Sequence, residues 1–146
     1  MEDRSGPAVA EMLQAAGFQI EGPVVVADER NDIVGMLVNA AEQGFSMVAT
    51  TGGTGVAARD VTPQATLDVV DYQVPGLAEQ MRRAGVEATP LAMLSREVAG
   101  VRGRTLIVNL PGSAKGAIES LNAILPALPH AIRLLRGETD HAAAPE

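Results

Sequence analysis

The most informative stretch of this 146-residue chain is Thr50-Thr51-Gly52-Gly53-Thr54-Gly55-Val56-Ala57-Ala58-Arg59-Asp60-Val61-Thr62-Pro63. The apolar run before it, Met47-Val48-Ala49, is typical of the end of a buried parallel strand. Three glycines within four residues then permit a turn that points several backbone N–H groups at one ligand. Thr62 as N-cap and Pro63 as first helical residue predict that a helix begins directly after the turn.

A strand, a glycine-rich turn and a helix start together favour an anion-binding site, because a helix N-terminus carries free N–H groups and partial positive charge. Arg59 adds a full positive charge, and Asp60 is able to hold a metal ion beside a phosphate. The alternative is a tight strand-to-helix turn with a solvated Arg–Asp pair. A glycine-rich loop alone does not separate these two, and this one matches neither the P-loop nor the dinucleotide pattern.

Composition bounds the class of protein. A length of 146 residues with 47% apolar residues indicates one globular domain. Two Phe, one Tyr and a net charge of −7 argue against a nucleic-acid partner. The absence of cysteine from the sequence excludes disulfides, thiolate metal sites and a cysteine nucleophile. No apolar run is long enough to span a membrane, so we expect no membrane partner. A chain without cysteine is compatible with a reducing cytoplasm, and we expect a cytoplasmic protein.

The first half of the chain alternates between helical and strand patterns. Apolar residues at helical spacing predict a helix that Ser5 or Gly6 caps and Gly17 ends. The β-branched run Val24-Val25-Val26 predicts a strand, a second helix follows up to Gly44, and residues 45–51 form the next strand. This alternation implies right-handed crossovers and a parallel sheet covered on both faces.

The second half continues with helices at residues 62–70, 91–94 and 125–135, and with a strand at residues 105–110 that two glycines precede in a tight turn. That strand ends in Asn109-Leu110-Pro111-Gly112-Ser113-Ala114-Lys115-Gly116, a second turn that opens a helix. A Pro-Gly turn before a helix is common in ordinary proteins. Two such turns at one sheet edge nevertheless favour a shared anion pocket, to which Lys115, the only lysine, would add a mobile charge.

Asp28 also follows a predicted strand, so it is expected at the same ligand-binding edge of the sheet. The alternative is that Asp28 and Glu29 simply favour the dipole of the next helix. Arg96, Arg102 and Arg104 either oppose a polyanionic ligand or remain solvated loop cations, and Arg96 is the favoured one of the three.

The pattern TTGGTG-xxx-RD-x-TP resembles the signature of the MoaB/MogA family of molybdopterin-binding proteins, which includes molybdopterin adenylyltransferases and the G domain of gephyrin. Asp28-Glu29, PG-x-x-E-x-MR at residues 75–82, Leu94-Ser95-Arg96 and the NLPG turn add to the resemblance. It implies a three-layer α/β/α domain with a mostly parallel sheet over residues 1–137, and a homotrimer. The remaining residues, 138–146, are predicted from the sequence itself to form a flexible tail. Gly85 stands where family members often carry a serine, which puts one pterin contact in question.

The resemblance implies an activity: Mg²⁺-dependent transfer of AMP from ATP to molybdopterin, with release of pyrophosphate. It assigns catalysis and Mg²⁺ binding to Asp28 and Asp60. It assigns nucleotide and phosphate binding to Thr51, Gly52, Gly53, Thr54, Gly55 and Arg59. It assigns molybdopterin binding to Ser95, Pro111, Gly112, Ser113, Lys115, Gly116 and Glu119. The alternative is a non-catalytic carrier or interaction module that binds molybdopterin, and the molybdate-inserting enzyme is a possible partner in either case.

One departure concerns the first strand of the family. Members begin with a buried strand, whereas this sequence starts at Met1-Glu2-Asp3-Arg4-Ser5-Gly6, inside the loop that follows that strand. A βαβ order calls for a strand there, and an empty central position leaves ladder groups unpaired. We therefore expect about 15–25 further residues upstream in the natural protein, enough for a strand and a loop.

Overall fold

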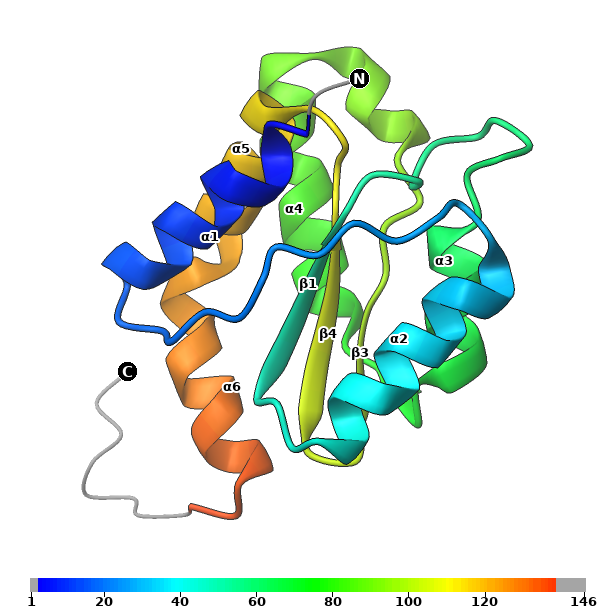
Figure 1. Cartoon of the computed structure of the whole chain (residues 1–146). Coiled ribbons are helices and arrows are strands. Elements are labelled where there is room, and N and C mark those ends of the chain that lie inside the picture. Colours follow the sequence, from blue (N-terminus) through cyan, green and yellow to red (C-terminus); the bar gives the residue numbers. More distant parts are fainter. Residues whose placement is uncertain (1–2, 139–146) are drawn as a thin grey trace.

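The computed structural model describes residues 3–138, which form three layers with a sheet in the middle (Figure 1). The strands are β1 (Met47–Thr51), β2 (Tyr72–Gln73), β3 (Ala99–Arg102) and β4 (Thr105–Leu110). The α-helices are α1 (Ser5–Ala15), α2 (Arg30–Glu42), α3 (Thr62–Val69), α4 (Pro75–Ala88), α5 (Ala114–Ile124) and α6 (Leu128–Leu135), and the 3₁₀ helices are η1 (Pro90–Leu94) and η2 (Leu125–Ala127). The predicted three-layer α/β/α architecture is confirmed.

The sheet has the order β1-β4-β3-β2 and is mixed rather than mostly parallel. β1 pairs with β4 in parallel, but β3 runs antiparallel to β4, and β2 antiparallel to β3. Strand β3 was not predicted, because its residues were assigned to the turn before β4. Arg102 pairs with Thr105 across a two-residue turn in which Gly103 has a φ of +60°. Such short hairpins need positive φ, so the glycine serves a hairpin and not a loop.

The predicted strand at Val24-Val25-Val26 is wrong. This segment forms no ladder, is drawn as coil between α1 and α2 in Figure 1, and leaves Val24 77% and Val25 82% exposed. β-Branched residues favour extended backbone, but a strand also needs a neighbour with free N–H and C=O groups. Among the described residues β1 pairs on one side only, and all five of its residues are half-buried rather than buried. The expected upstream segment stays a prediction.

Two of the expected helix caps are made differently. At α1 the carboxylate Oδ1 of Asp3 accepts hydrogen bonds from the backbone N of Gly6 at 3.0 Å and from Ser5 Oγ at 3.2 Å, so Asp3 caps this helix. At α3 the side chain of Thr62 makes no cap, and the Thr62 carbonyl instead accepts from Thr66 Oγ1 at 2.9 Å. The predicted helix at residues 125–135 is divided into η2 and α6, since its two prolines lack the N–H donors of a continuous helix.

Alternating residues of β4 face two separate cores, one on each side of the sheet. Leu106, Val108 and Leu110 pack with buried residues of α1, α4 and α5. Ile107 packs with buried residues of α2 and α3. This alternation follows from the two-residue period of a strand, and it explains why β4 is buried along its whole length.

Asn109 of the NLPG segment is fully buried and joins four parts of the fold. Its Oδ1 accepts from the backbone N of Val98 at 3.0 Å, and its Nδ2 donates to Thr50 Oγ1 at 3.1 Å and to Thr66 Oγ1 at 3.0 Å. A buried amide is tolerated when its donors and acceptor are used in this way. Asn109 therefore locks β4 to β1 and α3 immediately before the second glycine turn.

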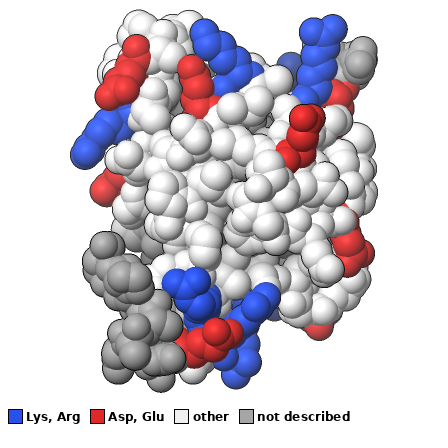
Figure 2. All heavy atoms as spheres, turned by 90° about the vertical axis from the view of Figure 1, so that its left-hand side faces the viewer, with Lys and Arg blue, Asp and Glu red and all other residues white. Residues whose placement is uncertain are grey.

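Charge is distributed unevenly over the face formed by α1, α5 and α6. Figure 2 shows most charged side chains of this face toward its two ends, with an uncharged area in the middle. The described helices all fall short of the length and apolarity that crossing a membrane requires. Of the predicted tail at 138–146, all but Glu138 lies outside the described residues.

Candidate active site

The two glycine turns lie against each other. Since β1 and β4 are parallel neighbours with Thr51 opposite Leu110, both turns leave the same edge of the sheet. The backbone N of Gly52 donates to the carbonyl O of Leu110 at 2.9 Å. A Cβ added to Gly112 would lie 3.3 Å from the Cα of Gly52, so the contact is between two backbones. The sequence predicted each turn separately, and the fold brings them together.

Gly53 sets the entry into α3. Its φ is +70°, and its carbonyl O accepts from the backbone N of Thr62 at 3.2 Å. A Cβ at this position would lie 2.3 Å from Thr62 Oγ1. Glycine is therefore required here both by the backbone angle and by the space.

Asp60 folds back over the same loop. Its Oδ2 accepts from the backbone N of Ala57 at 3.0 Å and lies 2.8 Å from where a Cβ on Gly55 would be. The missing side chain of Gly55 thus leaves the space that this carboxylate occupies. Asp60 is half-buried, so its carboxylate is ordered by the loop and still reaches the surface.

The guanidinium of Arg96 holds the loop in place. Arg96 Nε donates to the Gly55 carbonyl at 2.8 Å, and Arg96 Nη2 donates to the Asp60 carbonyl at 2.7 Å. Its backbone N also donates to the Thr54 carbonyl at 2.7 Å. We expected Arg96 to face an anion, but the fixed fork of its donors is instead committed to the two ends of the loop.

Replacing Arg96 by lysine tests this bracing. A single ammonium cannot reproduce the fork, so Arg96→Lys should speed amide hydrogen exchange in residues 55–60 by roughly tenfold, as expected for the loss of about one hydrogen bond to a charged group. Exchange in β4 should stay unchanged. Arg102→Lys is the matched control, because Arg102 Nη1 makes one bond to the Val69 carbonyl, at 2.9 Å, and does not touch the loop. Equal exchange in residues 55–60 of both variants would contradict the bracing.

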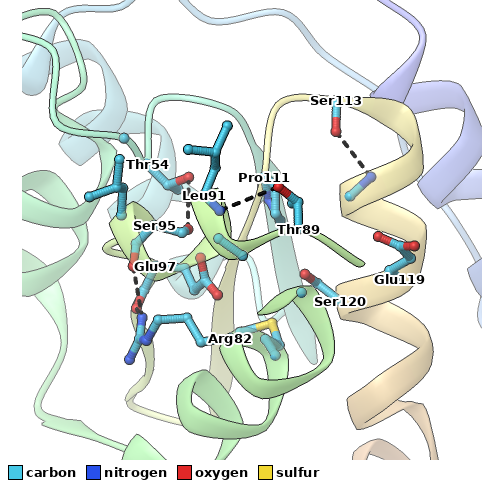
Figure 3. A pocket seen from close by; sticks show the side chains of 16 residues that line it. Thr54, Arg82, Thr89, Leu91, Ser95, Glu97, Pro111, Ser113, Glu119 and Ser120 are labelled. Carbon is cyan, nitrogen blue, oxygen red and sulfur yellow. Dashed lines mark hydrogen bonds between the residues drawn. The ribbon is translucent and has the colours of Figure 1, made fainter. Parts of the chain in front are cut away.

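A cavity of about 270 Å³ opens beside the two turns, between α4, η1 and α5 (Figure 3). It brings together seven of the predicted site residues: Thr54, Gly55, Ser95, Pro111, Ser113, Gly116 and Glu119. Ser95 Oγ donates to Thr54 Oγ1 at 3.4 Å, which links the expected nucleotide side to the expected molybdopterin side. Ser113 Oγ accepts from the backbone N of Gly116 at 3.0 Å and caps α5 at the rim.

The other predicted site residues do not line this cavity: Asp28, Thr51, Gly52, Gly53, Arg59, Asp60, Gly112 and Lys115. Asp28, Arg59 and Lys115 are exposed. Asp28 comes two residues after Val26, and Asp60 directly precedes Val61. Both valines pack against the core cluster of α2 and α3. The chain therefore runs from this one cluster to each of the two aspartates.

Sequence reasoning missed Glu97 and Arg82, which both line the cavity. Arg82 Nη1 donates to the carbonyls of Ser95 and Glu97, at 3.2 Å each. Glu97 is 3% exposed, and this burial raises the pKa of its carboxyl, although the charge of Arg82 acts in the opposite direction. The available signal was an acidic residue directly before the apolar run that forms β3.

The residues present are compatible with a Mg²⁺ ion held jointly with substrate. Within residues 3–138 no group of three or more His, Cys, Asp or Glu side chains is placed to hold a metal. Mg²⁺ is commonly bound by one or two carboxylates together with substrate phosphates. Asp60, whose carboxylate lies in the cradle left by Gly55, is suited to that kind of binding.

Comparisons with known proteins place the chain in a family. The family model described as "Probable molybdopterin binding domain" matches residues 1–130. A relative from Helicobacter pylori named molybdopterin adenylyltransferase is 42% identical, with 93% of this chain and 79% of the relative covered. One of the same name from Escherichia coli is 39% identical, with 93% and 77% covered.

Solved structures agree. The molybdopterin biosynthesis enzyme MoaB of Thermus thermophilus has a TM-score of 0.85 and 51% identity, with 94% of this chain and 87% of that chain covered. The Mog protein of Mycobacterium ulcerans has a TM-score of 0.89 and 42% identity, with 93% and 88% covered. The chain belongs to the family of molybdopterin-binding domains that includes MoaB and MogA, and the predicted resemblance is confirmed.

Proposed function

We propose that this protein is a molybdopterin adenylyltransferase of molybdenum cofactor biosynthesis, which transfers AMP from ATP to the terminal phosphate of molybdopterin. The observation that carries the proposal is the contact between the two glycine turns, Gly52 against Gly112, at the edge of the sheet beside the cavity. It is supported by the relatives of that name at 39–42% identity. Turns of this kind suit a reaction between two phosphate-bearing substrates, because backbone N–H groups bind phosphate well.

In the proposed reaction an oxygen of the molybdopterin phosphate attacks the α-phosphorus of ATP, and the bond from that phosphorus to the β-phosphate bridge breaks to release pyrophosphate. The protein's part is mainly to position the two phosphates and neutralise their charge. We assign the N–H groups of the first turn and Arg59 to the phosphates of ATP. Asp60 and Asp28 would hold Mg²⁺, which supplies positive charge next to the phosphate oxygens.

The molybdopterin side is assigned to the cavity and the second turn. Ser95, Pro111, Ser113, Gly116 and Glu119 line the cavity. Gly112 and Lys115 belong to the same turn and helix start, so the attacking phosphate would lie between the two turns. This assignment would bring the two phosphates together at the contact between Gly52 and Gly112.

The experiment is an assay of pyrophosphate release by the purified protein with ATP, Mg²⁺ and molybdopterin. We expect release that requires all three components and yields adenylylated molybdopterin in equal amount. The non-catalytic carrier is the alternative, and it predicts molybdopterin binding without pyrophosphate. Absence of pyrophosphate from protein that demonstrably binds molybdopterin would decide for the carrier.

Lys115 is exposed at the start of α5, where its charge would assist an anionic ligand. We expect Lys115→Ala to weaken molybdopterin binding by about three- to tenfold, as for a partly solvated charge contact, and to leave the melting temperature nearly unchanged. Isothermal titration and a thermal melt measure the two quantities. Arg133→Ala, an exposed cation on α6, is the control. Equal affinity in both variants would show that Lys115 is only a solvated cation.

We further propose a homotrimer and an encounter with the molybdate-inserting enzyme, as the resemblance implies, together with a cytoplasmic location. The uncharged area on the face of α1, α5 and α6 is suited to contact between copies (Figure 2). Sedimentation velocity of the purified protein measures the oligomer directly, and a monomer at micromolar concentration would contradict the trimer.

A further inference from the structure

A buried carboxylate lines the cavity with one of its two oxygens unpaired within residues 3–138. Glu97 is 3% exposed, and among the described residues its Oε2 has no hydrogen-bond partner. Figure 3 shows its carboxylate between Arg82 and the residues of the opposite wall, in the middle of the residues that line the cavity. Buried carboxylates are almost always paired, so an unpaired one calls for a partner that the free protein does not supply.

Arg82, the cation whose charge acts on Glu97, is already engaged. Its Nη1 donates to the backbone carbonyls of Ser95 and Glu97, which fixes the segment that carries Glu97. Arg82 therefore lowers the cost of the buried charge from a distance, without a hydrogen bond to the carboxylate. The acceptor capacity of Glu97 Oε2 is left for a molecule that enters the cavity.

A flat heterocycle with two adjacent N–H donors is one ligand that suits this carboxylate. The pyrimidine half of a pterin carries an exocyclic amino group beside a ring N–H, and this pair matches the two oxygens of a carboxylate. We propose that Glu97 is the specificity-determining residue for the pterin ring, accepting hydrogen bonds from its amino group and ring N–H. The inference rests on the proposed function, because molybdopterin is the substrate that brings a pterin to this cavity.

Two small fluorescent probes test the proposal without ATP or molybdopterin. Pterin carries the amino group, whereas in lumazine a carbonyl replaces it and would face the carboxylate. We expect the protein to bind pterin more tightly than lumazine. Glu97→Gln should lose about 10- to 100-fold in pterin affinity, as for hydrogen bonds to a charged group, and should lose nothing for lumazine, so that the preference disappears. Glu87→Gln, an exposed acid-to-amide change on α4, is the matched control.

The effect of Glu97→Gln on stability distinguishes a ligand-binding carboxylate from a merely structural one. Burial raises the pKa of Glu97, so the folded protein holds this proton more tightly than the unfolded chain. An acid with a raised pKa therefore costs stability increasingly as the pH rises above its ordinary value of 4.5. Glu97→Gln should raise the melting temperature at about pH 7.5, and this increase in melting temperature should shrink on acidification. A structural carboxylate would instead make Glu97→Gln melt earlier.

Binding has its own pH signature. Pterin affinity of the unaltered protein should fall on acidification as Glu97 takes up a proton, and this fall should be absent in Glu97→Gln. The other charged residues that line the cavity are Arg82 on α4 and Glu119 on α5. Glu97→Gln retains both, so any pH dependence that remains in this variant belongs to groups other than Glu97. A pterin preference that survives in Glu97→Gln would overturn the inference while leaving pyrophosphate release, and hence the proposed function, intact. If the unaltered protein prefers pterin through Glu97 but releases no pyrophosphate, the proposed function is overturned and the role of Glu97 stands.

Discussion

Asp60→Asn is expected to lower the rate of ATP-dependent pyrophosphate release by at least about 100-fold, equivalent to about 2.7 kcal/mol of transition-state stabilisation. Asp60 is proposed to hold Mg²⁺ against the phosphates of ATP. The amide has nearly the same shape but lacks the negative charge that makes a carboxylate a strong Mg²⁺ ligand. Steady-state assays at several Mg²⁺ concentrations measure the loss, which excess Mg²⁺ should repair only in part.

The structure explains why this variant should fold. Asp60 Oδ2 accepts one hydrogen bond from the backbone N of Ala57, at 3.0 Å, and the side-chain oxygen of asparagine can accept the same bond. Asp71→Asn is a matched control, since Asp71 Oδ2 accepts from the backbone N of Gly103 at 2.7 Å in an unrelated turn. Both variants should melt within about 1 °C of the parent, because surface changes of this kind alter stability little.

Only Asp60→Asn should lose activity. Near-normal pyrophosphate release from it would refute a catalytic role for Asp60 and leave the carboxylate as a cap of its own loop. Equal losses in the Asp60 and Asp71 variants would point to a general effect on the fold. Molybdopterin affinity should be close to that of the parent in both.

Gly53→Ala is expected to destabilise the protein by about 2–4 kcal/mol and to abolish nucleotide binding. The positive φ of Gly53 costs an alanine about 1 kcal/mol, and the new methyl would lie 2.3 Å from Thr62 Oγ1, an overpacking worth about 1–3 kcal/mol. The two residues cannot move apart freely, because the backbone N of Thr62 donates to the Gly53 carbonyl at 3.2 Å. Chemical denaturation and ATP titration measure the two effects.

A matched glycine separates the clash from the backbone strain. Gly44 has a φ of +84°, and a Cβ there would meet nothing within 4 Å, so Gly44→Ala should cost only about 1 kcal/mol. Removing the Thr62 hydroxyl should relieve the clash, so the double variant Gly53→Ala with Thr62→Ala should be less destabilised than the two single changes added together. Simple additivity of the two changes would mean that the loop and α3 do not press on each other at Gly53.

The features that sequence determines in this protein are local. The turns at Gly52–Gly55 and Pro111–Gly116 were predicted, because each depends on φ angles and hydrogen bonds between residues a few positions apart. The strand β4 was predicted from its own apolar run. The family motif is a short run of residues, most of which such a turn and helix start need. Its resemblance to the family predicted both the family and the three-layer fold. Its site assignments remain proposals.

Tertiary structure decided everything that depends on which segment lies beside which. Val24–Val26 has the composition of a strand, yet it is not one here, because β-propensity supplies no partner for its N–H and C=O groups. Arg96 was the favoured arginine for contact with an anion. Its guanidinium instead donates to the carbonyls of Gly55 and Asp60, 41 and 36 positions away in the sequence. For Glu97 the sequence offers only an acidic residue directly before an apolar run, which does not show that its carboxylate is buried. Its unpaired oxygen arises from burial beneath helices of distant sequence, and burial is a property of the packed chain, not of any short stretch.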